Sequence, residues 1–269
     1  MTENRITASE VEPLSYVEFM ALIDETNRPP GGKLAVRELI DKCNITSDDR
    51  VLDVGCNTGF VSFEISRVTG ADVIGIDMSE DMVAQARNRN QSGYSPQSVD
   101  FQKGDAQKLP FPDQSFDCVV SGGSTAFVHD IEAALSEYRR VVKDWGFVGE
   151  INFYYDETPP GDLIEELNDR MGTSIEEWYF DDWIELYENA GLEIYDVETH
   201  TIDHRSKKEV REYVQTISEN NNVTDAAKEA IESRLLELMQ LFNHNHEYLN
   251  YAVFTLRRRV VEEQPSLFS

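Results

Sequence analysis

Three aspartates, Asp53, Asp77 and Asp105, lie at the ends of three successive apolar segments of the sequence. The carboxyl ends of neighbouring parallel strands meet at one edge of a sheet, and open α/β sheets bind their ligands at that edge. A carboxylate at the end of the second strand can accept hydrogen bonds from both hydroxyls of a ribose. One such aspartate alone is more typical of a turn or a helix cap, but three at this spacing predict a site for an adenosine-containing ligand.

A glycine turn follows the first of these segments, with the pattern Asp53-x-Gly55-x-x-x-Gly59. Glycine lets the backbone pass close to a ligand, and the start of the next helix presents free N–H groups. The turn alone is also compatible with a tight connection that binds nothing. Its spacing differs from the GxGxxG of dehydrogenases, and the sequence has no GK[ST] motif, which disfavours dinucleotides and nucleoside triphosphates.

Strand and helix patterns alternate through the middle of the chain. Continuous apolar strands separated by amphipathic helices favour a parallel sheet that is covered by helices on both faces. The sequence therefore predicts an α/β fold with a doubly wound, seven-stranded, mostly parallel sheet. The expected strands are 50–54, 73–76, 99–103, 116–120, 147–153, 192–197 and 249–256.

Three segments fall outside this alternation and carry helix signals of their own. Capping boxes at Ser15 with Glu18 and at Ser206 with Glu209 begin two of the expected helices. Helices inserted after strands are candidates for a lid over the ligand edge of the sheet. The predicted organisation is an N-terminal helical lid segment (1–45), a core (46–202 and 249–258) with a lid insertion (154–178), a helical lid insertion (203–248) and a tail (259–269).

The charge balance is strongly acidic, because 51 Asp and Glu face 24 Lys and Arg and give a net charge of -27. A nucleic-acid partner requires clustered basic residues, and the one tight run, 257–259, is typical of a solvated strand end. We therefore expect no nucleic-acid partner. The even spread of acidic residues is similar to that of salt-adapted archaeal proteins, in which salt screens the repulsion. An ordinary acidic cytosolic protein is the alternative.

The sequence gives no sign of a membrane or an oxidising compartment. No segment approaches the roughly 20 uninterrupted apolar residues of a membrane span, and residues 1–10 lack the order of a secretory signal. Cys43, Cys56 and Cys118 show no CxxC spacing, and an odd number suits a reducing compartment. We expect three thiols, a cytoplasmic protein and no membrane partner.

Four segments in order resemble the class I S-adenosylmethionine-dependent methyltransferases, in particular the branch that includes the quinone-biosynthesis methyltransferases. The resemblance covers about residues 48–155 and extends more loosely to 198. It implies a Rossmann-like methyltransferase fold and S-adenosylmethionine as cofactor. Two departures are Asn57, where the family often has a second glycine, and 144–146, which replaces a Pro-Gly-Gly turn. The four segments are VLDVGCNTGF (51–60), GIDMSEDMVAQAR (75–87), GDAQKLPFPDQSFD (104–117) and ALSEYRRVVK (134–143).

The resemblance also implies which residues hold the cofactor. Asp77 would accept from the ribose hydroxyls, Asp105 from the adenine amino group, and Ser121 would face the amino acid portion. Gly55, Cys56 and Gly59 would bring backbone to the methionine part, with Met78 packing on the adenine. The implied cofactor-binding residues are Asp53, Gly55, Cys56, Gly59, Asp77, Met78, Asp105, Ala106 and Ser121.

Methyl transfer from a sulfonium is an in-line displacement, so the main task is to align the reactants in a dry pocket. A general base is needed only if the acceptor must lose a proton in the transition state. His129, at the start of an expected helix, is the first candidate, with a packing or capping role as the alternative, and Tyr154 is the second. The expected substrate and lid residues are Tyr16, Phe19, Arg28 and Tyr155.

His244 and His246 do not predict a metal site, because an i, i+2 pair diverges on a helix and no third ligand is evident. The functional prediction is a methyltransferase that uses S-adenosylmethionine and acts on a small-molecule acceptor. Two alternatives stay open: a module that binds S-adenosylmethionine without transferase activity, and a nicotinamide-dependent oxidoreductase. The acceptor and the oligomeric state are not determined by these patterns.

Overall fold

The computed structural model describes residues 7–23, 28–93, 99–219 and 224–260. Strands alternate with helices through the described core, as the apolar pattern predicts. The strands are β1 (Arg50–Val54), β2 (Asp72–Asp77), β3 (Asp100–Lys103), β4 (Phe116–Ser121), β5 (Val142–Tyr155), β6 (Glu193–Thr201) and β7 (Leu249–Arg257). The helices are α1 (Ala8–Val11), α2 (Tyr16–Leu22), α3 (Gly32–Lys42), α4 (Phe60–Thr69), α5 (Glu80–Gln91), η1 (Thr125–Phe127), α6 (Ile131–Val141), α7 (Gly161–Met171), α8 (Phe180–Asn189), α9 (Lys207–Glu219) and α10 (Asp225–Asn245).

The described residues form one seven-stranded sheet in the order β3-β2-β1-β4-β5-β7-β6. Neighbouring strands are parallel from β3 to β5, whereas β7 runs antiparallel to both β5 and β6. The predicted fold class, a doubly wound and mostly parallel seven-stranded sheet, is therefore confirmed.

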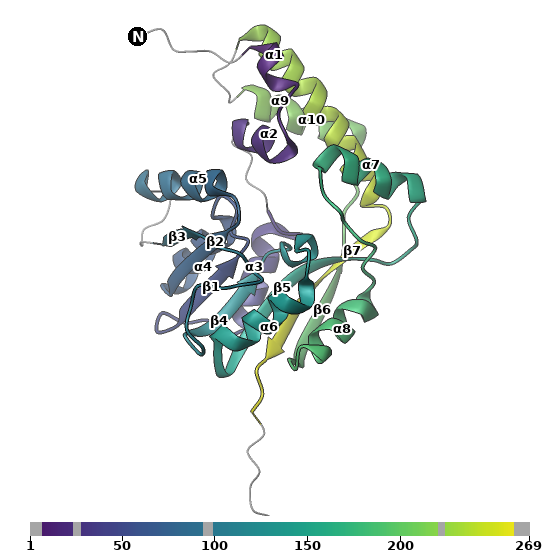
Figure 1. Cartoon of the computed structure of the whole chain (residues 1–269). Helices are drawn as coiled ribbons and strands as arrows, with labels where there is room; N and C mark the ends of the chain where they lie inside the picture. The colour runs from purple at the N-terminus through teal and green to yellow at the C-terminus, as the bar shows by residue number, and fades with distance from the viewer. Residues whose placement is uncertain (1–6, 24–27, 94–98, 220–223, 261–269) are drawn as a thin grey trace, which may run out of the picture.

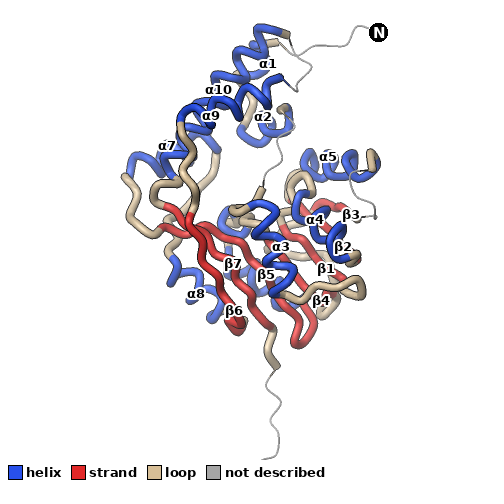
Figure 2. The backbone as a smooth tube through the Cα atoms, turned by 180° about the vertical axis from the view of Figure 1, so that it is seen from behind, coloured by secondary structure: helices blue, strands red, loops and turns tan. Residues whose placement is uncertain are grey.

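Each face of the sheet packs against its own set of helices. One apolar core joins alternate strand residues to α3, α4 and α5, and the other joins the remaining strand residues to α6 and α8. Figure 1 shows α6 and α8 in front of the sheet, and Figure 2 shows α3 and α4 in front of the opposite face. Both faces are buried, which is why the parallel strands read as continuous apolar runs.

A third apolar core belongs to a helical cap, which we define as α1, α2, α9 and α10. The cap lies beyond the carboxyl ends of the parallel strands, on the side where α5 follows β2 (Figures 1 and 2). Arg234 joins its parts, because its guanidinium donates to the carbonyls of Val11 and Leu14 at 2.8 and 2.7 Å. The cap core consists of Val11, Phe19, Met20, Ile23, Val214, Ala227, Ile231, Leu235 and Leu238.

Both predicted capping boxes are present at the starts of cap helices. The Ser15 backbone N–H donates to Glu18 at 2.8 Å, and the Ser206 backbone N–H donates to Glu209 at the same distance. These local patterns fixed the helix starts correctly because a capping box satisfies backbone donors within four residues of chain.

The helix α3, which the sequence grouped with the N-terminal lid segment, packs on the sheet. Its residues Val36, Leu39 and Ile40 are buried in the same core as β1 and β5. A Cβ added to Gly149 of β5 would lie 2.9 Å from Leu39, so this helix approaches the strand closely. The N-terminal segment is thus divided, with α1 and α2 in the cap and α3 on the sheet.

The helix α7, from the predicted insertion 154–178, lies between the cap and the sheet. Its Leu163, Ile164 and Leu167 share a small apolar core with Tyr155 of β5 and Leu249 of β7. Of the predicted tail 259–269, residues 261–269 lie outside the described part of the chain. None of the described helices combines the length and apolar character needed to cross a membrane.

The basic run at the end of β7 differs from the solvated strand end that we expected. Arg258 donates to the backbone carbonyls of Arg139 and Val142, at 3.0 and 2.8 Å, and its side chain is only 16% exposed. Arg257 and Arg259 both pair with Glu193 of β6. These arginines therefore join the end of β7 to α6, β5 and β6.

Candidate functional site

The glycine turn after β1 adopts a left-handed backbone at three positions. Gly55, Asn57 and Gly59 have φ angles of 70°, 49° and 92°. Asparagine is one of the few residues other than glycine that tolerates this conformation. Asn57 can therefore stand where the family often has glycine without changing the course of the chain. Gly59 ends the turn as the residue before α4.

Gly55 cannot carry a side chain, because the turn touches the segment after β4. A Cβ on Gly55 would lie 2.1 Å from Ser124 Oγ. The Ser124 hydroxyl donates to the carbonyl of Val54 at 2.7 Å. Sequence reasoning missed Ser124, since its partner lies 70 residues away in the chain.

Asp77, at the end of β2, connects two loops at the ligand edge of the sheet. One carboxylate oxygen accepts from the backbone N–H of Asn57 and the other from that of Ser79, both at 2.9 Å. Burial raises the pKa of this carboxyl above its ordinary value. Next to it, Met78 has 64% of its surface exposed. The two residues expected at the ribose and the adenine thus lie together beside the glycine turn.

Asp53 is fully buried beneath the same turn. The hydroxyl of Ser62, on α4, donates to its Oδ2. Burial raises the pKa of Asp53 to about 7. Its second oxygen, Oδ1, has no hydrogen-bond partner among the described residues. A buried acceptor without a donor suits a ligand that brings an ammonium group, such as the amino acid part of S-adenosylmethionine.

Asp105 and Ala106 lie in the loop that leaves β3. Asp105 is exposed, and its Oδ1 accepts from the backbone N–H of Gln107 at 2.9 Å, so the carboxylate shapes its own turn. Ala106 is half-buried and packs on the core beneath the loop. The structure therefore brings the ends of β1, β2 and β3 to one edge, with Asp105 the most exposed of the three aspartates.

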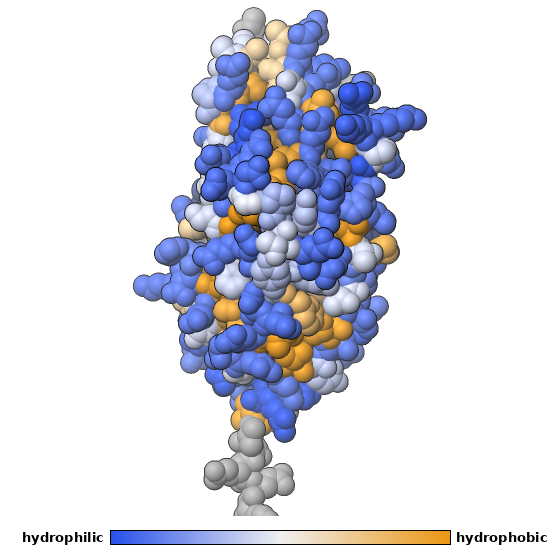
Figure 3. All heavy atoms as spheres, turned by 90° about the vertical axis from the view of Figure 1, so that its right-hand side faces the viewer, coloured by the Kyte–Doolittle hydropathy of each residue, from blue (hydrophilic) through white to orange (hydrophobic). Residues whose placement is uncertain are grey.

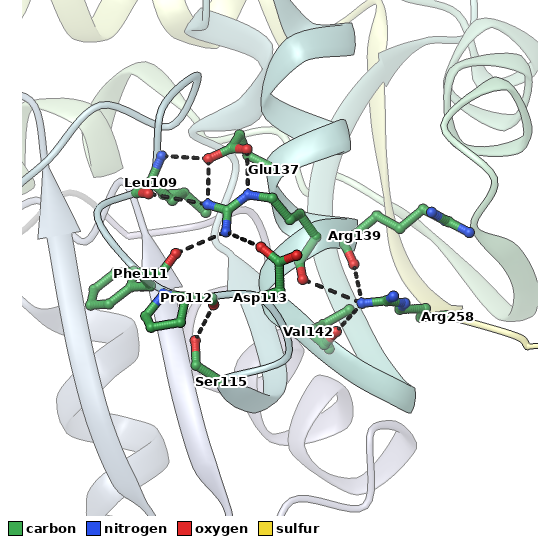
Figure 4. Close-up of polar contacts among 10 residues, drawn as sticks. Leu109, Phe111, Pro112, Asp113, Ser115, Glu137, Arg139, Val142 and Arg258 are labelled. Carbon is green, nitrogen blue, oxygen red and sulfur yellow. Dashed lines mark hydrogen bonds and ion pairs between the residues drawn. The ribbon is translucent and has the colours of Figure 1, made fainter.

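Arg140 of α6 holds the rest of this loop in place. Figure 4 labels its partners Leu109, Phe111, Asp113 and Glu137. Its guanidinium donates to the carbonyls of Leu109 and Phe111, at 3.2 and 2.8 Å, and to Asp113 at 2.8 Å. Glu137 pairs with Arg140 at 2.7 Å and accepts from the N–H of Leu109 at 2.7 Å. Sequence reasoning missed both residues, although their i, i+3 spacing of opposite charges on a helix was a visible signal.

Ser121, at the end of β4, does not lie on an open surface. Its side chain is fully buried and hydrogen-bonds to Ser124 at 2.9 Å and to Thr125 at 3.0 Å. Of the serines after β4, it is therefore Ser124 that reaches the glycine turn. The predicted role of Ser121 at the cofactor stays a prediction.

The two tyrosines at the end of β5 are both buried. Tyr154 packs edge-on against Phe180 with ring centroids 5.4 Å apart. The Tyr155 hydroxyl donates to Asn245 at 3.0 Å, which connects β5 to α10. Burial raises the pKa of both phenols, that of Tyr155 to about 12. Each is a neutral hydrogen-bonding group near pH 7, so neither is an ionised base.

The remaining predicted residues fall into two places. Phe19 is fully buried in the cap core, and Tyr16 packs edge-on against Phe242 within the cap at 6.2 Å. Arg28 is exposed, with its guanidinium 5.7 Å from the centre of the Phe60 ring, at the first residue of α4. His129 is exposed just before α6. Arg28 and His129 are thus accessible, whereas Tyr16 and Phe19 help to build the cap.

Two proline residues of the N-terminal segment lie next to the end of β4 and the first turn of α4. Pro29 and Pro30 are buried, and a Cβ on Gly122 would lie 3.4 Å from Pro29 and 2.8 Å from Val61. Small residues after β4 therefore let the Pro-Pro turn approach the glycine turn. This contact places Arg28 at the rim of the same edge of the sheet.

Of the two histidines at the end of α10, His246 packs against the sheet. The His246 ring stacks on Phe153 with centroids 5.9 Å apart, and burial lowers its pKa to about 4. His246 is therefore a neutral ring that packs within the structure. Within the described ranges, no group of three His, Cys, Asp or Glu side chains could hold a metal ion. All three cysteines are free and buried.

Comparison with known proteins assigns this edge of the sheet to a family. The family model described as "Methyltransferase domain" matches residues 51–146. Residues 51–146 are therefore similar to a methyltransferase domain. S-adenosylmethionine is the cofactor of such a domain, in agreement with the orphaned acceptor of Asp53 and the carboxylate of Asp77.

The chain is similar to named enzymes over part of its length. A sterol 24-C-methyltransferase of Gibberella zeae is 32% identical over 150 residues, which are 54% of this chain and 40% of that protein. A 2-phytyl-1,4-naphtoquinone methyltransferase of Synechococcus elongatus is 39% identical over 97 residues, which are 35% of this chain and 42% of that protein. The chain thus spans about two fifths of these relatives.

A solved structure extends the likeness of the fold to most of the chain. Phosphoethanolamine N-methyltransferase 2 of Haemonchus contortus, bound to S-adenosyl-L-methionine, has a TM-score of 0.70 at 19% sequence identity. The match covers 94% of this chain and 58% of that one. It therefore includes helices outside the methyltransferase domain as well as the sheet.

Proposed function

We propose that the chain is an S-adenosylmethionine-dependent methyltransferase that acts on a small-molecule acceptor by in-line methyl transfer. The observation that carries this proposal is the meeting of Asp53, Asp77 and the glycine turn at one edge of a methyltransferase domain. Asp77 is fixed by two backbone N–H groups, so its carboxylate is held in position before any ligand arrives.

The cofactor roles that we assign follow the strand ends. Asp53 Oδ1 would accept from the cofactor's amino group, and Asp77 from the ribose hydroxyls. Asp105 and the backbone of Ala106 would contact the adenine amino and ring nitrogens. The turn residues Gly55, Cys56 and Gly59, together with Met78 and Ser121, would complete the site as the family resemblance implies.

The bound cofactor supplies an electrophilic methyl group on a sulfonium sulfur. The work left to this chain is to hold the acceptor in line with that methyl group and to exclude water, and alignment alone can lower a barrier by about 7 to 11 kcal/mol. Tyr154 can donate a hydrogen bond as a neutral phenol, since burial raises its pKa. His129 is exposed just before α6, and we assign it the role of general base for an acceptor that must lose a proton.

We assign the lid function to the cap together with α7. The cap lies beyond the carboxyl ends of the parallel strands (Figure 1), and Tyr155 connects its helix α10 to β5 through Asn245. Arg28 stands at the rim between the cap and the glycine turn. Tyr16 and Phe19 would act in this lid by packing α2 in its place.

The acceptor that we favour is apolar or partly aromatic. Phe127, in η1 after β4, is an apolar side chain that we assign to no cofactor contact, and 52% of its surface is exposed. Relatives named for a sterol and for a phytyl-naphthoquinone support this choice. We propose that the chain belongs to the branch that includes the quinone-biosynthesis methyltransferases. The acidic surface disfavours nucleic acid as the acceptor.

A thermal-shift experiment separates this proposal from its alternatives. S-adenosylhomocysteine should raise the melting temperature of the full chain, and NAD should not. Asp77→Ala should reduce the shift, whereas Asp72→Ala, an exposed aspartate at the other end of β2, should keep it. A shift with NAD alone would favour the oxidoreductase.

Incubation of the protein with labelled S-adenosylmethionine and a panel of sterols, prenylated quinones and amines tests the transfer itself. Appearance of label in an apolar acceptor supports the proposal. Cofactor binding without label in any member of the panel, or in a cell extract, would favour the binding module without transferase activity.

We further propose that the protein is adapted to high salt and acts in the cytoplasm. Hydrophilic side chains cover most of the face in Figure 3, over both the cap and the sheet, and the net charge is -27. Salt at about 1 M reduces the Debye length to about 3 Å and should raise the melting temperature relative to dilute buffer. A melting temperature that stays constant from dilute buffer to molar KCl would contradict the salt adaptation.

A further inference from the structure

One buried carboxyl group takes no part in the site described above. Glu150 lies in β5, is fully buried, and pairs in register with Ser121 at the end of β4. It lies on the same face of β5 as Val148 and Asn152, which contact the side of the sheet that α6 and α8 cover. Its two oxygens contact Thr125 Oγ1 at 3.0 Å and the amide of Asn152 at 2.9 Å.

A chain of hydroxyl groups connects Glu150 to the glycine turn. Thr125 Oγ1 lies 3.0 Å from Ser121 Oγ, which lies 2.9 Å from Ser124 Oγ. Ser124 then donates to the carbonyl of Val54 at 2.7 Å and touches Gly55, the first residue of the turn. The chain thus ends on the segment to which we assign the methionine part of the cofactor.

The number of hydroxyl protons determines which group donates in each hydrogen bond of this series. Each hydroxyl has one proton, and that of Ser124 is used on the Val54 carbonyl. Ser121 must therefore donate to Ser124, and Thr125 must donate to Ser121. Thr125 then has one proton for two acceptors, Ser121 and Glu150, at 3.0 Å each, and a proton on the carboxyl group gives each contact a proton of its own.

Loss of that proton would reverse part of the chain. Ser121 and Thr125 both hydrogen-bond to the Glu150 carboxyl. An ionised carboxylate is a stronger acceptor than a hydroxyl, so it would draw their protons away from Ser124. Two hydroxyl oxygens 2.9 Å apart would then face each other without a proton between them. Ser124 would lose a partner that fixes it against the turn.

The surroundings of Glu150 favour the protonated form near neutral pH. Burial raises the pKa of Glu150 to about 8. The other titratable groups that face it are the phenols of Tyr138 on α6 and Tyr187 on α8, and burial raises the pKa of both. In the described part of the chain, the hydrogen-bond partners of Glu150 include no lysine or arginine.

We propose that Glu150 is a positioning residue: its protonated carboxyl fixes the cofactor-binding turn through Thr125, Ser121 and Ser124. Binding of the cofactor is then linked to the protonation of Glu150. The identity of the ligand in this inference rests on the proposed function. The link between Glu150 and the turn is independent of that function.

The first test measures the turn itself, without a ligand. Hydrogen exchange of the backbone amides 54–59 is compared between the wild type and Glu150→Gln at the same pH. The intrinsic exchange rate of each amide is then the same in both proteins, so a difference reports on protection. The two proteins should show equal protection near pH 6.5. Near pH 9 the wild type should exchange faster, since only its side chain ionises. Equal protection at both pH values would overturn the inference, whether or not the protein binds S-adenosylmethionine.

The second test measures calorimetric affinity for S-adenosylhomocysteine across the same pH range. The wild type should lose about fivefold or more relative to Glu150→Gln at the alkaline end, the size of a typical coupling between two sites. Titration of the ligand's own amino group affects both proteins equally. Glu198→Gln, which removes one exposed charge on β6, should follow the wild type.

Each outcome has a distinct meaning. Parallel affinity profiles for the wild type and Glu150→Gln would overturn the inference but leave the proposed function standing. Absence of binding by the wild type at every pH would overturn the proposed function. Should Glu150→Gln fail to fold, Thr125→Val cuts the same chain at its second link. Thr125→Val should loosen less at alkaline pH than the wild type, because only the Ser121 hydroxyl then responds to Glu150, and loosening equal to that of the wild type would overturn the inference.

Discussion

Replacement of Asp77 offers a sharp test of the cofactor site. Its carboxylate accepts hydrogen bonds from two backbone N–H groups, those of Asn57 and Ser79, at 2.9 Å each. Hydrogen bonds to a charged group contribute about 1.5 to 3 kcal/mol each, and a buried carboxyl loses part of this to desolvation. Water can reach the freed N–H groups of these loops. Asp77→Ala should therefore lower the free energy of unfolding by about 1 to 3 kcal/mol.

The effect on the ligand should be separate from this loss of stability. Two ribose hydroxyls that donate to Asp77 would add a contribution of about 1 to 3 kcal/mol to binding, or roughly a 5- to 150-fold change in the dissociation constant. Asp77→Asn keeps one acceptor oxygen for the backbone and removes the charge. It should therefore retain most of the stability and still lose affinity.

The assay is calorimetry with S-adenosylhomocysteine, paired with urea unfolding of each variant. This ligand has no sulfonium charge, so the net charge of -27 contributes little to the difference between variants. Asp72→Asn, at the opposite end of the same strand, is the matched control. Unchanged affinity in both Asp77 variants would remove Asp77 from the ribose role. An equal loss in the Asp72 variant would assign the effect to charge alone.

Three further outcomes follow from the geometry. Gly55→Ala should abolish measurable calorimetric binding of S-adenosylhomocysteine, because the added Cβ would lie 2.1 Å from Ser124 and the backbone φ of 70° strains an alanine. Retained affinity would contradict this role of Gly55. Arg140→Lys should lower the free energy of unfolding in urea by about 1 to 3 kcal/mol, because an ammonium cannot span the carbonyls and carboxylates that the guanidinium holds. Folded Glu150 keeps its proton up to about pH 8 while the unfolded chain loses it near pH 4.5, so wild-type stability should fall between these values. The slope should be at most about 1.4 kcal/mol per pH unit, and Glu150→Gln should remove this part of the decline in urea titrations at several pH values.

Local patterns in the sequence were sufficient for the elements and for the first half of the site. Continuous apolar runs specify buried parallel strands, and Ser-x-x-Glu specifies a helix start, because each depends on residues a few positions apart. The positions of the glycine turn and of Asp77 at strand ends were predicted for the same reason. Even the departure at Asn57 has a local explanation, since its φ of 49° is one that asparagine tolerates.

Contacts between distant segments were beyond the reach of those patterns. The sequence grouped α3 with the lid, but only the packed structure divides the N-terminal segment between cap and sheet. Both Arg140 and Ser124 act on loops that lie 25 or more residues away along the chain. Helix propensity and apolar periodicity carry no information about which loop a long polar side chain will reach.

The sequence by itself determined the α/β fold class, the order of its strands along the chain and the three aspartates at the strand ends. Only the tertiary structure decided that β7 runs antiparallel between β5 and β6, and that Glu150 is buried in contact with Thr125. The physical reason is that burial and hydrogen-bond partners are properties of neighbouring segments in space. A single glutamate in an apolar strand pattern has no marked partner until the sheet and its helices close around it.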